Sequence, residues 1–256
     1  MNKKERLGYQ VVVLALIVGL VLLGLSYYNL RIDYQEEKMT WAGRRSLPNV
    51  LDQLDNYLEE ARNLDFKALK QAVLLLTYDT PTSRVNASAV VIDKARGYIV
   101  SNQHVIQGHR GNISVYGQGE EGPVYYCQAS LLKSSQDLDL ALLKLDLAGA
   151  EEDLDLEELR LGDASSIKLA DTIYTISSPK KQINSLNKGI VSALRYRNDR
   201  WEIQLSSPLY PGDSGGALID SRGQLIGILT YRIKDAERLG YAVSVRELEA
   251  FLGDLE

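Results

Sequence analysis

The feature that most constrains the fold is a succession of short β-type runs, which begins near residue 69 and recurs at intervals of roughly ten residues. Each run is rich in Val, Ile, Leu, Tyr or Thr, and Gly, Pro, Asn or Asp separates it from the next. Such a succession favours an all-β sandwich or barrel, and about 190 residues suffice for one β unit or two small barrels packed together. The runs lie at residues 72–78, 88–93, 97–101, 112–117, 124–133, 140–146, 172–176, 189–194, 201–206, 216–220, 224–232 and 241–245.

Two segments within this region have a helical pattern instead, at residues 154–159 and 245–256. No long amphipathic pattern lies between the strand-like runs. This argues against a parallel sheet with crossover helices.

The N-terminal region differs, because residues 7–30 contain no charged side chain. At about 1.5 Å per residue, a helix of this length reaches ~36 Å, which is enough for a hydrocarbon core of ~30 Å. Basic residues outnumber acidic ones in residues 1–6, so the positive-inside rule leaves these residues in the cytoplasm and carries the following chain across the membrane. A cleaved signal peptide is the alternative, but the apolar run exceeds a typical h-region and no clear cleavage site follows it.

Residues 31–66 form a polar juxtamembrane linker with a predicted helix at residues 46–64. Leu51, Leu54, Leu58 and Ala61 recur on one face of this helix. The face could serve oligomerisation or a partner, or it could pack on the following domain. It is shorter than the three to four heptads that indicate a coiled coil, which favours packing.

Composition excludes several classes of protein. The 256 residues carry 29 basic and 34 acidic side chains, a net charge of −5, without the basic excess that draws proteins to nucleic acid. The single cysteine, Cys127, excludes an intrachain disulfide framework and CxxC sites. With two histidines and no HExxH spacing, the sequence predicts neither a metal site nor a cofactor.

The strongest candidate for chemistry is the GDSGG motif at residues 212–216. A nucleophilic serine needs a tight turn that exposes its Oγ, small neighbours that admit a carbonyl group, and N–H groups that converge on an oxyanion. Ser214 meets these conditions, although a glycine-rich turn without chemistry has the same local pattern.

A base and candidate acids occur upstream of this serine. His104 follows a strand-like run, and its neutral ring can accept a serine proton near physiological pH, whereas His109 lies in a polar loop. Asp137, Asp139 and Asp146 compete to orient His104. Asp139 directly precedes an apolar run, which favours it, whereas Asp137 has the character of a solvated loop charge.

Five ordered motifs resemble those of HtrA/Deg-type serine proteases with a trypsin-like fold. They are SNQHVIQG (101–108), DLDLALLKLD (137–146), NKGIVSAL (187–194), GDSGGAL (212–218) and YAVSV (241–245). The resemblance implies a protease domain over residues 67–256, made of two six-stranded β-barrels with the active site in the cleft between them. It also implies polypeptide substrates and a homo-oligomer, with a trimer as the family's state.

Carried over residue by residue, the resemblance makes Ser214 the nucleophile, His104 the general acid–base, and Asp139 the residue that orients the imidazole. Gly212, Asp213 and Ser214 would form the oxyanion turn. The N–H groups of Gly212 and Ser214 would form the oxyanion hole, with Asp213 between them.

The resemblance also places a substrate strand at residues 227–231. Ile228, Leu229 and Thr230 would pair with an extended substrate and wall an apolar pocket. Thr230 and Tyr231 would narrow that pocket, and Pro208 stands where a trypsin-type enzyme has the carboxylate that selects basic residues. We therefore expect small or medium aliphatic residues at P1 rather than Lys or Arg.

Three departures from the family pattern stand out. The family usually has Gly-Ser-Gly where this chain has Ala87-Ser88-Ala89, and commonly Asn where it has Asp213. The chain also ends at Glu256, just beyond the last matching strand, so no PDZ domain is expected within it.

Together these features predict a single-pass protein of the cell (inner) membrane, with a cytoplasmic N-terminus and a periplasmic or otherwise extracytoplasmic serine endopeptidase domain. Its predicted role is proteolysis of misfolded or regulatory envelope proteins, that is, protein quality control. One alternative is a catalytically silent peptide-binding adaptor or chaperone of the same fold. Another is an assembly protein organised by the helix at residues 46–64.

Overall fold

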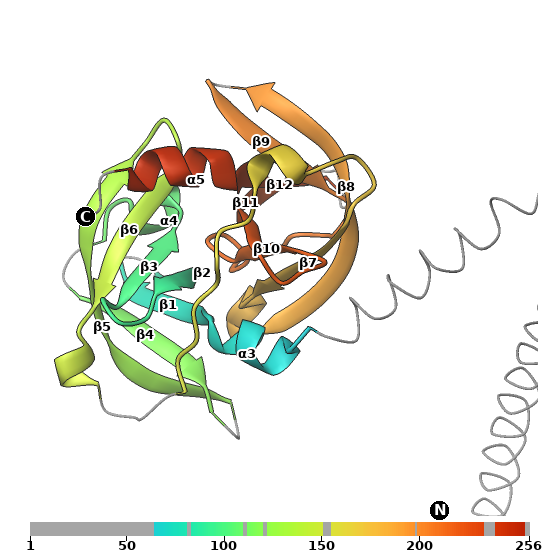
Figure 1. Cartoon of the computed structure of the whole chain (residues 1–256). Helices are drawn as coiled ribbons and strands as arrows, with labels where there is room; N and C mark the ends of the chain where they lie inside the picture. The colour runs from blue at the N-terminus through green and yellow to red at the C-terminus, as the bar shows by residue number, and fades with distance from the viewer. Residues whose placement is uncertain are drawn as a thin grey trace, which may run out of the picture. The chain divides into compact units, whose positions relative to one another are not determined.

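The computed structural model describes residues 64–80, 83–109, 112–119, 122–150, 155–197, 199–232 and 239–253. The predicted anchor at residues 7–30 and the helix at residues 46–64 lie almost wholly outside these ranges. Among the helices that the structure does describe, none is long and apolar enough to cross a membrane. The two barrels described below form the part of the chain drawn in colour in Figure 1.

The first half of the described chain forms a closed antiparallel barrel with the strand order β1-β2-β3-β6-β5-β4. Its strands are β1 Val73–Asp79, β2 Arg84–Asp93, β3 Tyr98–Ser101, β4 Ile113–Gln118, β5 Pro123–Ser135 and β6 Leu140–Leu145. Closure of the sheet leaves no unpaired edge around the barrel.

The second half repeats the architecture in the order β10-β11-β12-β9-β8-β7. Its strands are β7 Thr172–Ser177, β8 Ser185–Arg197, β9 Arg200–Leu205, β10 Ala217–Asp220, β11 Leu225–Arg232 and β12 Gly240–Ser244. Each of the twelve runs picked out in the sequence corresponds to one of these strands, so the prediction of two six-stranded barrels is confirmed.

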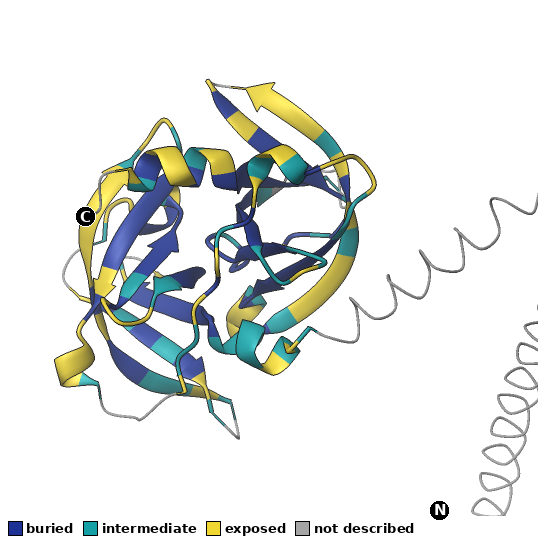
Figure 2. Ribbon diagram, in the orientation of Figure 1, coloured by how far each residue is buried: buried dark blue, intermediate teal, exposed yellow. Residues whose placement is uncertain are grey.

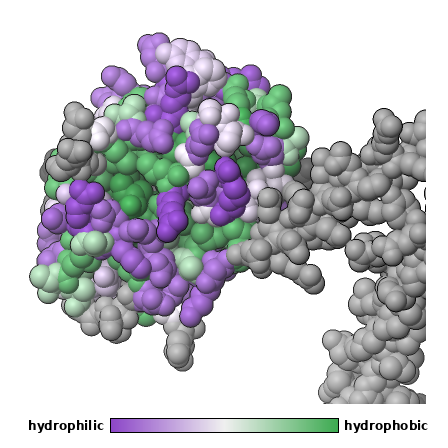
Figure 3. All heavy atoms as spheres, viewed as in Figure 1, coloured by the Kyte–Doolittle hydropathy of each residue, from purple (hydrophilic) through white to green (hydrophobic). Residues whose placement is uncertain are grey.

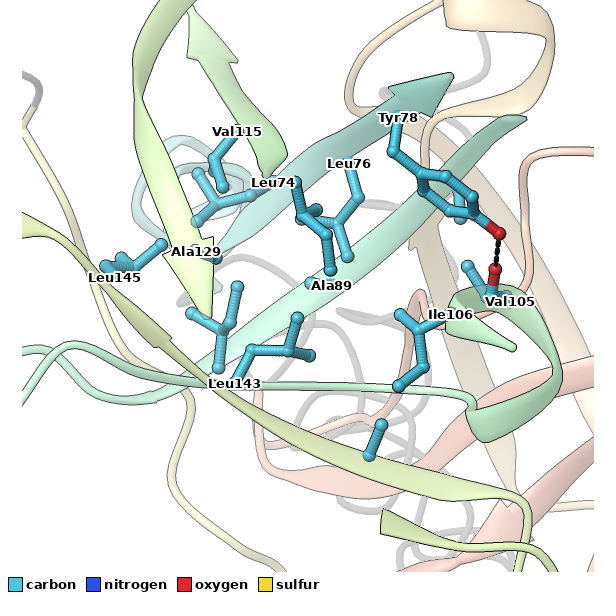
Figure 4. Close-up of a cluster of buried hydrophobic side chains, with 14 of the residues drawn as sticks. Leu74, Leu76, Tyr78, Ala89, Val105, Ile106, Val115, Ala129, Leu143 and Leu145 are labelled. Atoms are coloured by element: carbon cyan, nitrogen blue, oxygen red, sulfur yellow. Dashed lines mark hydrogen bonds between the residues drawn. The ribbon is translucent and has the colours of Figure 1, made fainter. Parts of the chain in front are cut away.

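Alternation along the strands produces three hydrophobic clusters rather than two. In β1, Leu74 and Leu76 point into the first barrel, while Val73 points out of it toward the second. Figure 4 shows the first cluster, where the Tyr78 hydroxyl donates to the carbonyl of Val105. The middle cluster joins outward faces of both barrels, so strands such as β1 are buried on both sides and appear dark blue in Figure 2.

Short helices close and connect the barrels. They are α3 Phe66–Gln71, α4 Gln103–Ile106, α5 Val245–Leu252, and the 3-10 turns η2 Leu147–Gly149, η3 Ala164–Ser166 and η4 Pro179–Lys181. α5 begins where the sequence predicts a helix, with Ser244 as its N-cap, and buries Leu248 and Phe251 in the middle cluster.

The helix predicted at residues 154–159 is wrong where the structure describes it, because residues 155–160 have no helical structure. The N–H of Leu159 donates to the carbonyl of Val91, and its side chain packs into the cluster between the barrels. Glu157 forms an ion pair with Lys94. Tertiary contacts of an extended connecting segment therefore override the helical pattern.

The surface visible in Figure 3 mixes hydrophilic side chains with a hydrophobic area near its middle. Among the described residues, no group of three or more His, Cys, Asp or Glu side chains is placed to hold a metal ion.

Candidate active site

The histidine and the favoured aspartate meet in the first barrel. His104 lies on the one-turn helix α4, and Asp139 ends the turn that leads into β6. The His104 Nδ1 lies 2.9 and 2.8 Å from the two carboxylate oxygens of Asp139, and its backbone N–H donates to Oδ1 at 2.9 Å. Because Nδ1 faces an acceptor, the ring proton belongs on Nδ1, which leaves Nε2 free to accept a proton.

The turn before β6 holds Asp139 in an unusual backbone conformation. Its φ is 55°, in the left-handed region, and its carbonyl accepts a hydrogen bond from Asn102 Nδ2 at 3.0 Å. Asn102 is fully buried and precedes α4 directly. One side chain thus ties the segment that carries the aspartate to the segment that carries the histidine.

The environment of Asp139 stabilises its ionised form. Burial alone would raise the pKa of its carboxyl, but hydrogen bonds from His104 and Thr230, together with the charge of His104, hold the pKa below its usual value. Thr230 Oγ1 donates to Oδ2 at 2.6 Å. The carboxylate is therefore held by both barrels, since Thr230 lies on β11.

The other two candidate acids lie elsewhere. Asp146 caps η2 through Gly149, and the carbonyl of Asp137 accepts from Arg200 Nη1 at 3.3 Å. The structure places neither carboxylate against His104.

Ser214 follows the glycine turn that leads into β10. Its hydroxyl donates to the carbonyl of Thr230 at 2.7 Å. Within the described residues it forms no hydrogen bond with His104, although both side chains line the same pocket. Rotation about one side-chain bond would release the hydroxyl from Thr230, and catalytic hydrogen bonds are often unformed before substrate binds.

The turn at residues 211–214 orients two backbone N–H groups. Gly212 has a φ of 104°, and a Cβ there would lie 2.7 Å from the carbonyl oxygen of Ser178, so only glycine fits. The Pro211 carbonyl accepts from the N–H of Lys180 at 3.1 Å. In a trans peptide the C=O and the next N–H point in opposite directions, so the Gly212 N–H points away from Lys180.

The N–H groups of Gly212 and Ser214 donate to no group of a described residue. By contrast, the N–H of Asp213 donates to the carbonyl of Tyr210 at 3.0 Å. Two such N–H groups are available to donate to an oxyanion, which is the role that the sequence analysis predicts for them.

Asp213 points its side chain away from this surface. The residue is 3% exposed, and its carboxylate accepts from Ser177 Oγ at 2.8 Å and from the N–H of Tyr210 at 2.5 Å. Burial raises the pKa of the Asp213 carboxyl, and these two hydrogen bonds offset only part of that effect.

A pocket of about 230 Å³ opens beside these groups. It is lined by His104, Leu209, Tyr210, Pro211, Asp213, Ser214, Thr230 and Tyr231. Of the residues predicted to contact substrate along β11, Thr230 and Tyr231 line it. Ile228 and Leu229 are fully buried, the first between the barrels and the second inside the second barrel.

The sequence analysis missed three of the pocket residues, Leu209, Tyr210 and Pro211, and Leu209 is the most buried of them. It is 4% exposed, and a Cβ on Gly240 would lie 2.8 Å from its Cγ, so the leucine packs directly over the β12 glycine. One signal in the sequence could have found Leu209. Its neighbour Pro208 stands where a trypsin-type enzyme has the carboxylate that selects basic residues, which places this segment beside the pocket.

Comparisons with known proteins match the same region. Residues 87–228 match the family described as "Trypsin-like peptidase domain". The chain is 28% identical over 175 residues to a "Serine protease HtrA-like" of Staphylococcus epidermidis, across 62% of this chain and 28% of that protein. It is 32% identical over 152 residues to a "Probable periplasmic serine protease do/HhoA-like" of Haemophilus influenzae, across 56% of this chain and 30% of that protein. The chain thus spans less than a third of these relatives.

Solved structures share the fold. "HtrA-type protease AlgW with tripeptide" is 30% identical with a TM-score of 0.60, and the match covers 75% of this chain and 60% of that chain. The serine endoprotease from Yersinia pestis is 25% identical with a TM-score of 0.61, over 76% of this chain and 64% of that chain.

Proposed function

This chain belongs to the trypsin-like peptidase family, and from that membership we propose that it is a serine endopeptidase that works through Ser214, His104 and Asp139. The observation that carries the proposal is the His104–Asp139 pair, joined at 2.8 Å, whose histidine lines one pocket with Ser214 on its glycine turn. These are the groups that acyl transfer from a peptide bond requires.

In the proposed reaction, the Ser214 hydroxyl turns from Thr230 and gives its proton to Nε2 of His104 while Oγ attacks the substrate carbonyl carbon. The N–H groups of Gly212 and Ser214 stabilise the oxyanion of the tetrahedral intermediate. His104 then returns the proton to the leaving amine, and water hydrolyses the acyl-enzyme by the same steps.

Asp139 acts through His104 in this scheme. Its carboxylate keeps the ring in the tautomer with the proton on Nδ1 and stabilises the imidazolium that forms. The hydroxyl of Thr230 holds the carboxylate in place, because it donates to the oxygen that faces the second barrel.

The proposed substrates are polypeptides bound in extended form along β11. β10 pairs with β11 only up to Ile228. Beyond that point the carbonyl of Thr230 accepts from the Ser214 hydroxyl, and once the proposed reaction releases this hydroxyl, the backbone of residues 230–231 is open to a substrate strand. Leu209 over Gly240 restricts the depth of the pocket, which supports small or medium aliphatic residues at P1. The Asp213 carboxylate is turned away, so it offers no charge to a basic P1 residue.

The proposed location of this domain is outside the cytoplasm, anchored to the cell membrane by residues 7–30, with misfolded or regulatory envelope proteins as substrates. The charge pattern of the first 30 residues supports it. The name of the Haemophilus influenzae relative includes the word "periplasmic".

Kinetics of single variants tests the proposed triad. Turnover of a peptide substrate by Ser214→Ala and His104→Ala is expected to fall on the order of 10⁶-fold, and by Asp139→Asn about 10⁴-fold. His109→Ala and Asp137→Asn are matched controls and should keep wild-type turnover. Wild-type turnover by Ser214→Ala or His104→Ala would exclude the mechanism. If Asp137→Asn lost turnover and Asp139→Asn kept it, Asp137 rather than Asp139 would be the residue that orients His104.

One observation favours a second candidate, a peptide-binding adaptor: the Ser214 hydroxyl is engaged by Thr230 rather than by His104. If the protein is an adaptor, wild type and Ser214→Ala should bind unfolded polypeptides with equal affinity, and neither should cleave them. Time-dependent product formation by the wild type alone would exclude it.

A further inference from the structure

A serine of the first barrel holds the oxyanion turn of the second. Ser88 lies on β2, is fully buried, and uses every polar atom it has in a hydrogen bond of 2.8 Å. Its Oγ donates to the carbonyl of Gly212 and accepts from the N–H of Ser178. Its backbone N–H donates to the carbonyl of Ser214, and its carbonyl accepts from Ser101 Oγ.

The strand geometry explains why Ser88 is available for these contacts. Its neighbours Ala87 and Ala89 point into the first barrel, so alternation turns Ser88 toward the second. β2 pairs with β3 only from Val90 onward, which leaves the backbone of Ser88 without a partner in β3.

These hydrogen bonds fix the two residues that would bind the oxyanion. Gly212 is the most deformable point of the turn, since glycine has access to conformations that other residues lack. The peptide before it is held by Lys180, whose N–H donates to Pro211, and the peptide after it is held by Ser88 Oγ. With both flanking peptides fixed, the direction of the Gly212 N–H is fixed as well.

We propose that Ser88 is a positioning residue for the oxyanion hole, through which the first barrel sets the reactivity of a nucleophile carried by the second. The inference rests on the proposed function. It predicts that loss of the hydroxyl weakens binding of the transition state more than binding of the substrate, because the N–H groups matter only when the oxyanion forms.

The test compares Ser88→Ala with Ser244→Ala in the full 256-residue chain. Ser244 is also buried, and its Oγ also accepts from one backbone N–H, that of Arg246, but it lies at the start of α5 outside the proposed site. We expect both variants to lower Tm. Only Ser88→Ala should lower kcat, about 10- to 100-fold with KM within about twofold, and should weaken inhibition by a peptidyl aldehyde by a similar factor.

Ser88→Cys separates the hydrogen bonds from the space they occupy. A thiol fills the site but is a weak donor and acceptor, so kcat should stay close to that of Ser88→Ala. If Ser88→Ala does not fold, this variant carries the test. A kcat within twofold of wild type for either folded variant, with only Tm changed, overturns the inference alone. A wild type that neither cleaves peptides nor reacts with a fluorophosphonate overturns the proposed function and this inference with it.

Discussion

Asp139 and Asp213 are both largely buried in the site, yet their surroundings act on them in opposite directions. Asp139 faces His104 and Thr230, and its pKa is lowered. Among the described residues, Asp213 has two donors, Ser177 Oγ and the N–H of Tyr210, and burial raises its pKa. The difference arises from the donors. The hydrogen bonds and charge of His104, with the Thr230 hydroxyl, more than offset the desolvation of the Asp139 carboxylate, whereas two neutral donors offset only part of the desolvation of Asp213.

The raised pKa of Asp213 predicts a pH-dependent gain from Asp213→Asn. Because the pKa of Asp213 is higher in the folded state than in the unfolded chain, ionisation of this carboxyl destabilises the folded state. The variant should therefore unfold at a higher urea concentration than wild type at pH 7. The gain should shrink as the pH falls from the raised pKa of the folded state toward the ordinary value of 3.8.

Asp139→Asn is the matched comparison, with the opposite sign. The Asp139 carboxylate stabilises the fold above pH 3.8, and this stabilisation is lost as the pH falls through the lowered pKa of the folded state. Asp139→Asn should therefore be less stable than wild type at pH 7. Urea titrations at several pH values measure both. A stability deficit of Asp213→Asn that grows with pH would show that its carboxylate stabilises the fold in its charged form.

The residues alone left three aspartates open, and the resemblance to HtrA-type proteases grouped Asp139 with His104 and Ser214. The structure places Asp139 against His104, and His104 in one pocket with Ser214. The sequence analysis noted Ser88 within the Ala87-Ser88-Ala89 motif but could not assign it a role, because the partners of its side chain, Gly212 and Ser178, lie on the other barrel. Contacts of that kind depend on tertiary placement.

At the scale of elements, β11 shows how alternation restricts a strand's part in the site. Ile228 and Leu229 point into separate hydrophobic clusters, and only Thr230 and Tyr231 reach the pocket. The sequence predicted the strand correctly, yet a run of apolar residues does not reveal which faces are buried when both sides of the strand pack.

Leu209, in the segment between β9 and β10, is expected to limit the size of the P1 residue. Leu209→Ala should raise kcat/KM for P1 Leu or Phe relative to P1 Ala by about tenfold or more, since one methylene in a hydrophobic pocket changes discrimination by about 1–3 kcal/mol. Profiling on a peptide series with varied P1 residues measures this ratio.

Leu205→Ala is the control for that experiment. Leu205 belongs to the same hydrophobic cluster but does not line the pocket, so its truncation should cost about 2–5 kcal/mol of stability without altering the P1 profile. An unchanged profile for Leu209→Ala, or the same change in both variants, would remove Leu209 as the determinant.

On the scale of the whole molecule, the site exists only where the two barrels meet. The first barrel carries His104 and Asp139, the second carries Ser214 and the proposed oxyanion turn, and hydrogen bonds of Thr230 and Ser88 connect them. The recurrence of short strands predicted an all-β unit, and the resemblance to HtrA-type proteases predicted the two six-stranded barrels. The middle hydrophobic cluster that joins them follows from which outward faces are apolar, and periodicity alone does not assign those faces.

The proposed anchor gives a prediction for the full chain in cells. With residues 7–30 in the bilayer, the protein should remain in membranes after carbonate extraction, and protease added outside spheroplasts should digest the domain that starts near residue 67. Deletion of residues 1–30 should leave the chain in the soluble cytoplasmic fraction. A wild-type domain that resists external protease in intact spheroplasts would contradict the orientation.

The central claim, that Ser214 is activated by His104, is tested most directly by fluorophosphonate labelling of the 256-residue chain with intact-mass detection. A serine Oγ that displaces fluoride from phosphorus adds one phosphonyl group. We predict one adduct on wild type, none on Ser214→Ala, and markedly slower labelling of His104→Ala than of His109→Ala. Equal labelling of wild type and Ser214→Ala, or no adduct on folded wild type, would contradict the account.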